Sequence, residues 1–134
     1  MPLVRVSLLK GKAPEHIRAL SDAIYRALVE SYGMPENDLF QIFEQLEPGS
    51  LLFDRNYGGG PRSDDFMLIT IRSDARRADE KEALMTRLVD NLATSAGVRG
   101  EDVFIVLETN STLEDYSFSS GISATQMVAP DPSK

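Results

Sequence analysis

The chain has no cysteine and no tryptophan, and His16 is its single histidine. Without cysteine, disulfides, thiolate nucleophiles and zinc–sulfur clusters are excluded. One histidine cannot by itself build a multi-histidine metal site or a serine–histidine pair. We therefore expect no metal site, and acid–base chemistry must come from other groups.

Long apolar runs and an excess of positive charge are also missing. The apolar stretches are short pieces such as 66–69, far below the roughly 20 residues needed to span a bilayer. The first residues lack the basic start, long apolar stretch and cleavage site of a signal peptide. The 14 basic and 21 acidic side chains give a net charge of −7, whereas nucleic acids and anionic membranes select a basic face. The sequence predicts a cytoplasmic protein that binds neither nucleic acid nor membranes.

The length of 134 residues suits one domain with its own core. We expect that domain to cover residues 1–128. The last residues, 129–134, contain two prolines and are expected to form a disordered tail.

An internal repeat organises the chain, with a constant offset of 64 residues between its copies. The copies cover about 2–45 and 66–109. Identical residues fall at structurally informative positions: Leu28 and Leu92, Ser31 and Ser95, Gly33 and Gly97, Asp38 and Asp102, Phe40 and Phe104, Glu44 and Glu108. The repeat indicates two copies of one supersecondary unit.

Each copy has the pattern of a strand, a helix and a second strand. Alternating apolar residues predict strands over 3–9 and 66–72. Apolar residues at helical spacing follow each of them, and Gly33 and Gly97 are expected to end the two helices in left-handed caps. The returning strands are predicted over 39–45 and 103–108.

Two such units predict an α+β fold, with a four-stranded sheet and two helices on one face. Since helices cover only one face, the other must be buried elsewhere, which favours a homo-oligomer. The same element order also fits a ferredoxin-like topology, because strand adjacency cannot be read from periodicity. That alternative would suit a non-catalytic ligand-binding oligomer.

Two further segments lie outside the repeat units. Residues 46–65 contain a glycine triplet, 58–60, which we interpret as a turn because no phosphate-binding Lys-Ser/Thr follows it. Residues 115–118 are predicted to form a small hairpin or arm.

Pro2 is the first candidate for catalysis. If the initiator methionine is removed, as commonly happens before a small residue, the chain begins with a secondary amine. An α-amino group has a reference pKa of about 8, and partial desolvation lowers it toward neutrality. The amine could therefore serve as a base at the start of the first strand. The alternative is that a proline follows Met1 by chance.

These features together resemble the tautomerase superfamily, and most closely its malonate semialdehyde decarboxylase branch. The resemblance rests on the start Met1-Pro2-Leu3-Val4, the duplicated unit, and segments 33–38, 47–49 and 110–118. It covers nearly the whole chain apart from the last several residues. It implies a homotrimer in which each active site contains the amino-terminal proline of a chain.

The resemblance also implies roles for individual residues. Arg76 matches the arginine that binds a substrate carboxylate, and Asp38 matches an acidic residue that bonds substrate or activates water. Where the decarboxylase has a second arginine, this chain has Asp74, and Arg72 or Arg77 could supply that cation. Other interpretations stay open: Arg76 could lie at a solvated helix start, and Asp38 could only stabilise a turn, as expected for Asp102.

Tyr116 and Phe118 match aromatic positions that form an apolar wall near the proline. They could equally be contacts between subunits.

The leading hypothesis is a cofactor-independent enzyme that tautomerises a small 2-oxo acid or enol. Neutral Pro2 would transfer the proton while Arg76 holds the substrate carboxylate. The alternative chemistry is decarboxylation or hydration of a 3-oxo acid resembling malonate semialdehyde, with Pro2 as a cation that polarises a carbonyl. The two reactions require opposite protonation states of Pro2.

Overall fold

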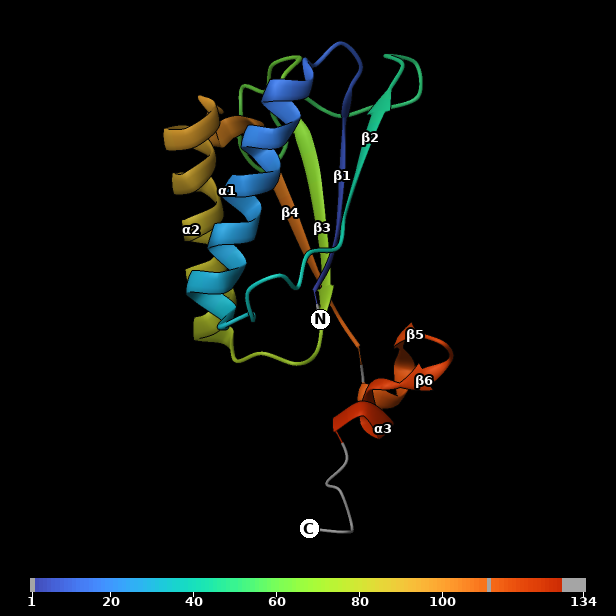
Figure 1. The fold of residues 1–134 in the computed structure, drawn as a ribbon. Helices are drawn as coiled ribbons and strands as arrows, with labels where there is room; N and C mark the ends of the chain where they lie inside the picture. The colour runs from blue at the N-terminus through green and yellow to red at the C-terminus, as the bar shows by residue number, and fades with distance from the viewer. Residues whose placement is uncertain (1, 111, 129–134) are drawn as a thin grey trace, which may run out of the picture.

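The computed structural model describes residues 2–110 and 112–128 (Figure 1). Residues 129–134, which were predicted to form a disordered tail, lie outside the described residues, as does Met1. The main elements follow in chain order: β1 (Leu3–Leu9), α1 (Pro14–Tyr32), β2 (Gln41–Leu46), β3 (Met67–Ser73), α2 (Ala78–Ala96) and β4 (Val103–Thr109). The single-turn helix η1 (Gly100–Asp102) precedes β4. A C-terminal segment then contains η2 (Leu113–Asp115), β5 (Ser117–Ser119), β6 (Ile122–Ser123) and α3 (Ala124–Val128).

The four long strands form one sheet in the order β2-β1-β3-β4. Strands β1 and β2 pair in parallel, as do β3 and β4, while β1 and β3 pair antiparallel and join the two units. The predicted α+β fold with duplicated β-α-β units is therefore confirmed. The ferredoxin-like alternative is wrong, because that topology splits the β-α-β unit with another strand, whereas β1 and β2 are direct neighbours.

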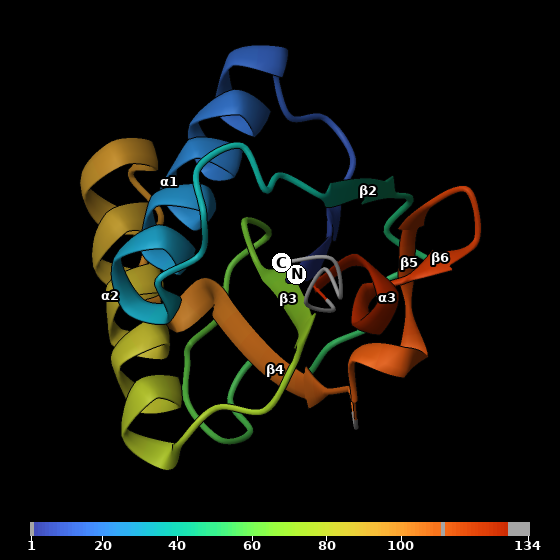
Figure 2. The same cartoon turned by 60° about the horizontal axis from the view of Figure 1, so that its bottom comes forward.

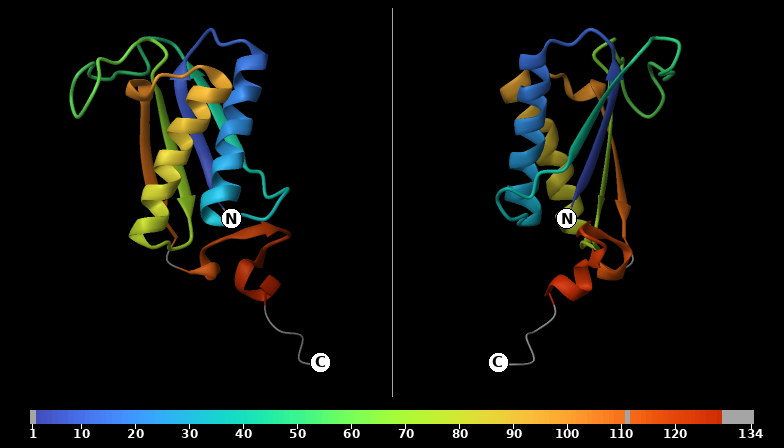
Figure 3. Two further views of the ribbon diagram at one scale, coloured as in Figure 1. Left: turned by 90° about the vertical axis from the view of Figure 1, so that its left-hand side faces the viewer. Right: turned by 45° about the vertical axis from the view of Figure 1, so that its right-hand side comes forward.

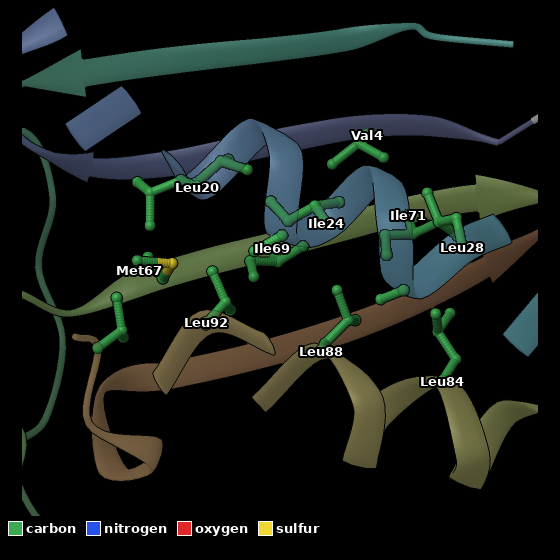
Figure 4. Close-up of a cluster of buried hydrophobic side chains, with 14 of the residues drawn as sticks. Val4, Leu20, Ile24, Leu28, Met67, Ile69, Ile71, Leu84, Leu88 and Leu92 are labelled. Carbon is green, nitrogen blue, oxygen red and sulfur yellow. The ribbon is translucent and has the colours of Figure 1, made fainter. Parts of the chain in front are cut away.

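Both long helices cover one face of the sheet, and no helix of the described residues covers the other (Figure 3). The core lies between the helices and the sheet (Figure 4). Alternate residues of β3 enter it, including Ile69 and Ile71, and residues at helical spacing face them, including Ile24 from α1 and Leu88 from α2. The apolar residues that alternate along the strands and those that recur at helical spacing thus pack together in one layer.

Each long helix ends at a glycine with left-handed backbone geometry. The φ angle is 61° at Gly33 and 67° at Gly97, and each N–H donates to a carbonyl of the last helical turn. A side chain at such an angle would be strained, so glycine is favoured. The predicted caps are confirmed, and they direct the chain back toward the sheet.

Three strands differ slightly from their predicted bounds, and the smallest difference is in β4, which ends at Thr109 instead of residue 108. Strand β2 begins at Gln41 instead of residue 39, because the preceding chain is still in a turn, with Asn37 at a φ of 71° and Leu39 N–H bonded to the Asn37 carbonyl. Strand β3 covers Met67–Ser73, one residue later than expected.

The other two predicted segments lie at opposite ends of the sheet (Figure 3). The glycine triplet 58–60 lies in turns, and the expected hairpin is present as the antiparallel pair β5 and β6. In the ranges that the structure describes, no helix is long and apolar enough to cross a membrane.

Candidate functional site

One end of the sheet gathers residues from both repeat units. The β1–β3 register pairs Leu3 with Arg72, so continuing it by one residue places Pro2 beside Ser73. On the other side of β1, Val4 pairs with Gln41, which places Pro2 beside Leu39, the residue after Asp38. Figure 2 views this end directly, where β1 starts and β3 ends. Pairing alone therefore brings Pro2, Asp38 and the Ser73–Asp74 corner to one place.

Pro2 is buried, although it stands next to the amino end of the chain. Its neighbour Val4 anchors the strand, since the Val4 N–H donates to the Phe40 carbonyl at 3.0 Å. Asn110, just beyond β4, donates its N–H to the Ser73 carbonyl at 2.7 Å and holds the opposite side of this corner. The predicted position of Pro2 at the start of an ordered strand is therefore the observed one.

Arg76 lies in the short loop between β3 and α2 and points back toward α1. Its guanidinium contacts the Asp74 carboxylate at 2.8 Å and lies over the Tyr32 ring, 4.7 Å from the ring centroid. Only 18% of the Arg76 side chain is exposed. The interpretation as a fully solvated helix start is therefore wrong for Arg76, whose position is fixed by an ion pair and a cation–π contact.

Tyr116 connects this corner to the C-terminal segment. Burial raises the pKa of its phenol above the usual range, and the nearby carboxylates of Asp74 and Asp38 raise it further. Asp38 itself is half-buried in the turn before β2. Tyr116 therefore keeps its proton at neutral pH and can donate a hydrogen bond in this space.

An aromatic wall lies beside these polar groups. The rings of Tyr116 and Phe118 meet edge to face with centroids 5.5 Å apart, and Phe118 contacts Phe40 at 5.8 Å. Phe40 comes from the turn before β2, so the wall joins the C-terminal segment to the main sheet. Tyr116 and Phe118 thus form an aromatic wall within one chain, and their role beside a substrate stays a prediction.

Arg72 and Arg77 lie apart from this group in the described chain. Arg72 is on the bare face of β3, where two of its nitrogens donate to Glu108 at 2.7 and 3.0 Å. Arg77 is exposed at the start of α2 and pairs with Asp79 and Glu80. Arg76 is therefore the arginine of the three that pairs with Asp74, whose carboxylate acts on the Tyr116 phenol, and a binding role for any of the three stays a prediction.

The repeat partners Asp38 and Asp102 have different surroundings. Asp102 is fully buried and accepts hydrogen bonds from the Ser63 N–H at 2.6 Å and the Ser63 hydroxyl at 2.7 Å. These hydrogen bonds connect the long loop between β2 and β3 to η1. Asp102 thus has the structural role that was expected for it. Asp38 lies instead near the Tyr116 phenol, so the equal sequence positions do not have equal surroundings.

Tyr32 and Phe40 contact residues of the site but were not singled out from the sequence, and Tyr25, whose spacing favours packing on a helix face, contacts the turn before β2. The Tyr32 ring packs against the Arg76 guanidinium. Burial is the main cause of the raised pKa of the Tyr32 phenol. The Tyr25 hydroxyl accepts a hydrogen bond from the Asn37 N–H at 3.0 Å and so positions the turn that carries Asp38. Tyr32 has one signal in the sequence, because it precedes Gly33, and Phe40 is marked there only as the repeat partner of Phe104.

Across residues 2–110 and 112–128, no group of three or more histidine, cysteine, aspartate or glutamate side chains could hold a metal ion. Asp38, Asp74, Arg76 and Tyr116 supply two carboxylates, one guanidinium and one phenol at this end of the sheet. These groups can bind an anion, stabilise a developing negative charge and exchange protons.

The fold and site together define an α+β protein of two β-α-β units, with a buried proline beside acidic and basic groups. Family models described as tautomerase enzymes match residues 38–119 and residues 2–57. Probable tautomerase YusQ of Bacillus subtilis strain 168 is 33% identical, over 90% of this chain and 95% of that protein. The chain belongs to the tautomerase superfamily and is an enzyme of that superfamily.

Comparison with solved structures indicates the branch of the superfamily to which the chain belongs. A malonate semialdehyde decarboxylase, described with decarboxylase and hydratase activities, is 30% identical with a TM-score of 0.86, over 93% of this chain and 95% of that one. A fused 4-OT symmetric trimer shares the fold at 24% identity and a TM-score of 0.76, over 95% of this chain and 99% of that one. The chain thus lies in the malonate semialdehyde decarboxylase-like branch.

Proposed function

We propose that the protein is a cofactor-independent tautomerase that acts on a small 2-oxo acid or enol. The observation that carries this proposal is the burial of Pro2 at the end of the sheet where Asp38, Arg76 and Tyr116 converge. Removal of Met1 leaves a secondary amine on Pro2. That amine takes the proton from the enol hydroxyl and returns a proton to the adjacent carbon, so the reaction is balanced without a co-reactant.

Other residues of the site assist this transfer. Arg76 binds the substrate carboxylate through its guanidinium. Tyr116, which keeps its proton at neutral pH, donates a hydrogen bond to the oxygen that gains negative charge. Phe40 and Phe118 form a dry side for the apolar part of the substrate.

Decarboxylation or hydration of a 3-oxo acid is the second candidate. Two observations favour it: the likeness to malonate semialdehyde decarboxylase, and the presence of two carboxylates, Asp38 and Asp74, at the corner where Pro2 lies. Carboxylates favour a positively charged amine, which would polarise a carbonyl. A Pro2 amine with a pKa below roughly 7 supports the base role, and one above roughly 8 supports the acid role.

The proposed assembly is a homotrimer formed through the bare face of the sheet. This face carries exposed apolar side chains, among them Ile42, Phe104 and Val106. A cavity of about 330 Å³ adjoins it, between the long loop and β3–β4, and is lined almost entirely by apolar residues. Exposed apolar surface of this kind marks an interaction site. The trimeric arrangement of the fused 4-OT protein is consistent with such an assembly.

Replacing Arg76 by methionine tests the substrate-binding role. We expect kcat/KM for ketonisation of phenylenolpyruvate to fall about tenfold, because the substrate carboxylate loses its charged partner. The matched control is Arg87→Met, which removes an arginine of α2 that pairs with Glu30 and is expected to change kcat/KM less than about twofold. Equal losses in the two variants would contradict the assignment of Arg76.

A further inference from the structure

The guanidinium of Arg76 already binds a carboxylate of its own chain. Its Nη1 lies 2.8 Å from Asp74 Oδ1, and its Nη2 lies 3.5 Å from the Tyr32 carbonyl oxygen. The two partners are 18% and 40% exposed, so solvent screens this pair less than an open surface pair. A ligand carboxylate that reaches Arg76 must therefore share the guanidinium with Asp74 or displace it.

The first copy of the repeat offers an internal comparison for Arg76. The offset of 64 residues places Lys12 at the position of Arg76 and Phe66 at the position of Pro2. Lys12 forms an ion pair with Asp65, the residue immediately before Phe66. A cation at this repeat position is thus compensated by a carboxylate in both copies. In the second copy that carboxylate comes from Asp74, only two residues from the cation.

The charges around Tyr116 give the consequence for a ligand. Asp38 and Asp74 both act on the phenol, and Arg76 is the cation paired with Asp74. A ligand carboxylate entering this space gains attraction from one guanidinium and meets repulsion from two carboxylates. An uncharged ligand of the same shape avoids that repulsion.

We infer that Asp74 is a specificity-determining residue, which acts as the internal counter-ion of Arg76 and reduces the preference of the site for carboxylate ligands. The site then accepts an uncharged carbonyl or enol compound, such as an ester or amide, almost as well as the corresponding acid. This inference deepens the proposed function and rests on its placement of the ligand beside Arg76. It concerns binding only and is independent of whether Pro2 transfers a proton.

The test compares two unreactive ligands of equal shape, 3-phenylpropionate and its uncharged amide, by titration calorimetry. For the wild-type protein we expect dissociation constants within about threefold of each other. In Asp74→Asn the carboxylate should bind about tenfold more tightly, while the amide changes less than about twofold. The matched control, Asp79→Asn, removes the same charge from an exposed pair at the start of α2 and should leave both constants unchanged.

Adding Arg76→Met to the Asp74→Asn variant should abolish the gain, because the gain depends on the released guanidinium. The inference is overturned if Asp74→Asn leaves the ratio of the two constants unchanged, or if Asp79→Asn changes it equally. Failure of the proposed function is a separate result. In that case the protein, with or without Pro2, would not ketonise phenylenolpyruvate, yet the ratio of the binding constants would still respond to Asp74.

Discussion

Replacing Pro2 by alanine is expected to lower kcat/KM for ketonisation of phenylenolpyruvate by about 100-fold. The proline ring fixes the backbone at the buried start of β1, whereas alanine leaves a primary amine on a freer chain end. General acid–base catalysis by a positioned group contributes roughly 10²- to 10⁴-fold, and the alanine variant keeps part of it. The measurement is the initial rate of enol disappearance with mature protein whose amino end is verified by intact mass.

A second form of the protein distinguishes the contribution of the Pro2 amine from that of the proline ring. One extra residue ahead of Pro2 turns the amine into an amide, which cannot accept a proton near neutral pH. We expect this form to lose the full contribution, roughly 10²- to 10⁴-fold, and thus to be slower than the alanine variant. The same residue added at the carboxyl end is the control, and thermal unfolding checks that both forms fold. Equal activity in all four proteins would contradict a role for Pro2.

Introducing a charge on the bare face of the sheet is expected to convert the protein to monomers. Val106 lies on β4 opposite Thr70 and is 38% exposed in the single chain. In the proposed trimer this position is buried between subunits. A Val106→Lys side chain would place an ammonium there without a partner, at a cost of several kcal/mol per subunit. Light scattering at micromolar concentration should show a trimer for the wild type and a monomer for the variant.

The control for this experiment adds the same charge elsewhere. Thr86 is exposed on α2, on the helix layer that covers the opposite face of the sheet. We expect Thr86→Lys to remain trimeric, because its ammonium stays in water. A trimeric Val106→Lys protein, or a wild type that is monomeric, would rule out this face as the interface.

Much of the fold could be predicted because the repeat is marked by glycines and by apolar periodicity. Gly33 and Gly97 end the helices where a left-handed residue is required, and alternating residues of β1 and β3 form the core. Strand adjacency was not determined by these patterns. The direct pairing of β1 with β2 excludes the ferredoxin-like alternative, which periodicity had left open.

The site was less accessible from the sequence, because its contacts join distant segments. The stacking of Arg76 on Tyr32 links the loop after β3 to the end of α1, and the Phe40–Phe118 contact links the residue before β2 to the C-terminal hairpin. No local pattern encodes such pairs. The three arginines at 72, 76 and 77 could not be ranked by type alone, and they differ in the structure because one lies on the bare face and another at an exposed helix start.

The most direct test of the account is to titrate the Pro2 nitrogen in ¹⁵N-proline-labelled mature protein and compare it with the pH profile of kcat/KM. The account predicts a free amine whose pKa lies below roughly 7, with activity rising as that amine loses its proton. A Pro2 nitrogen that remains an amide in fully active protein would contradict the account. So would a pH profile of kcat/KM that does not follow the titration of the Pro2 amine.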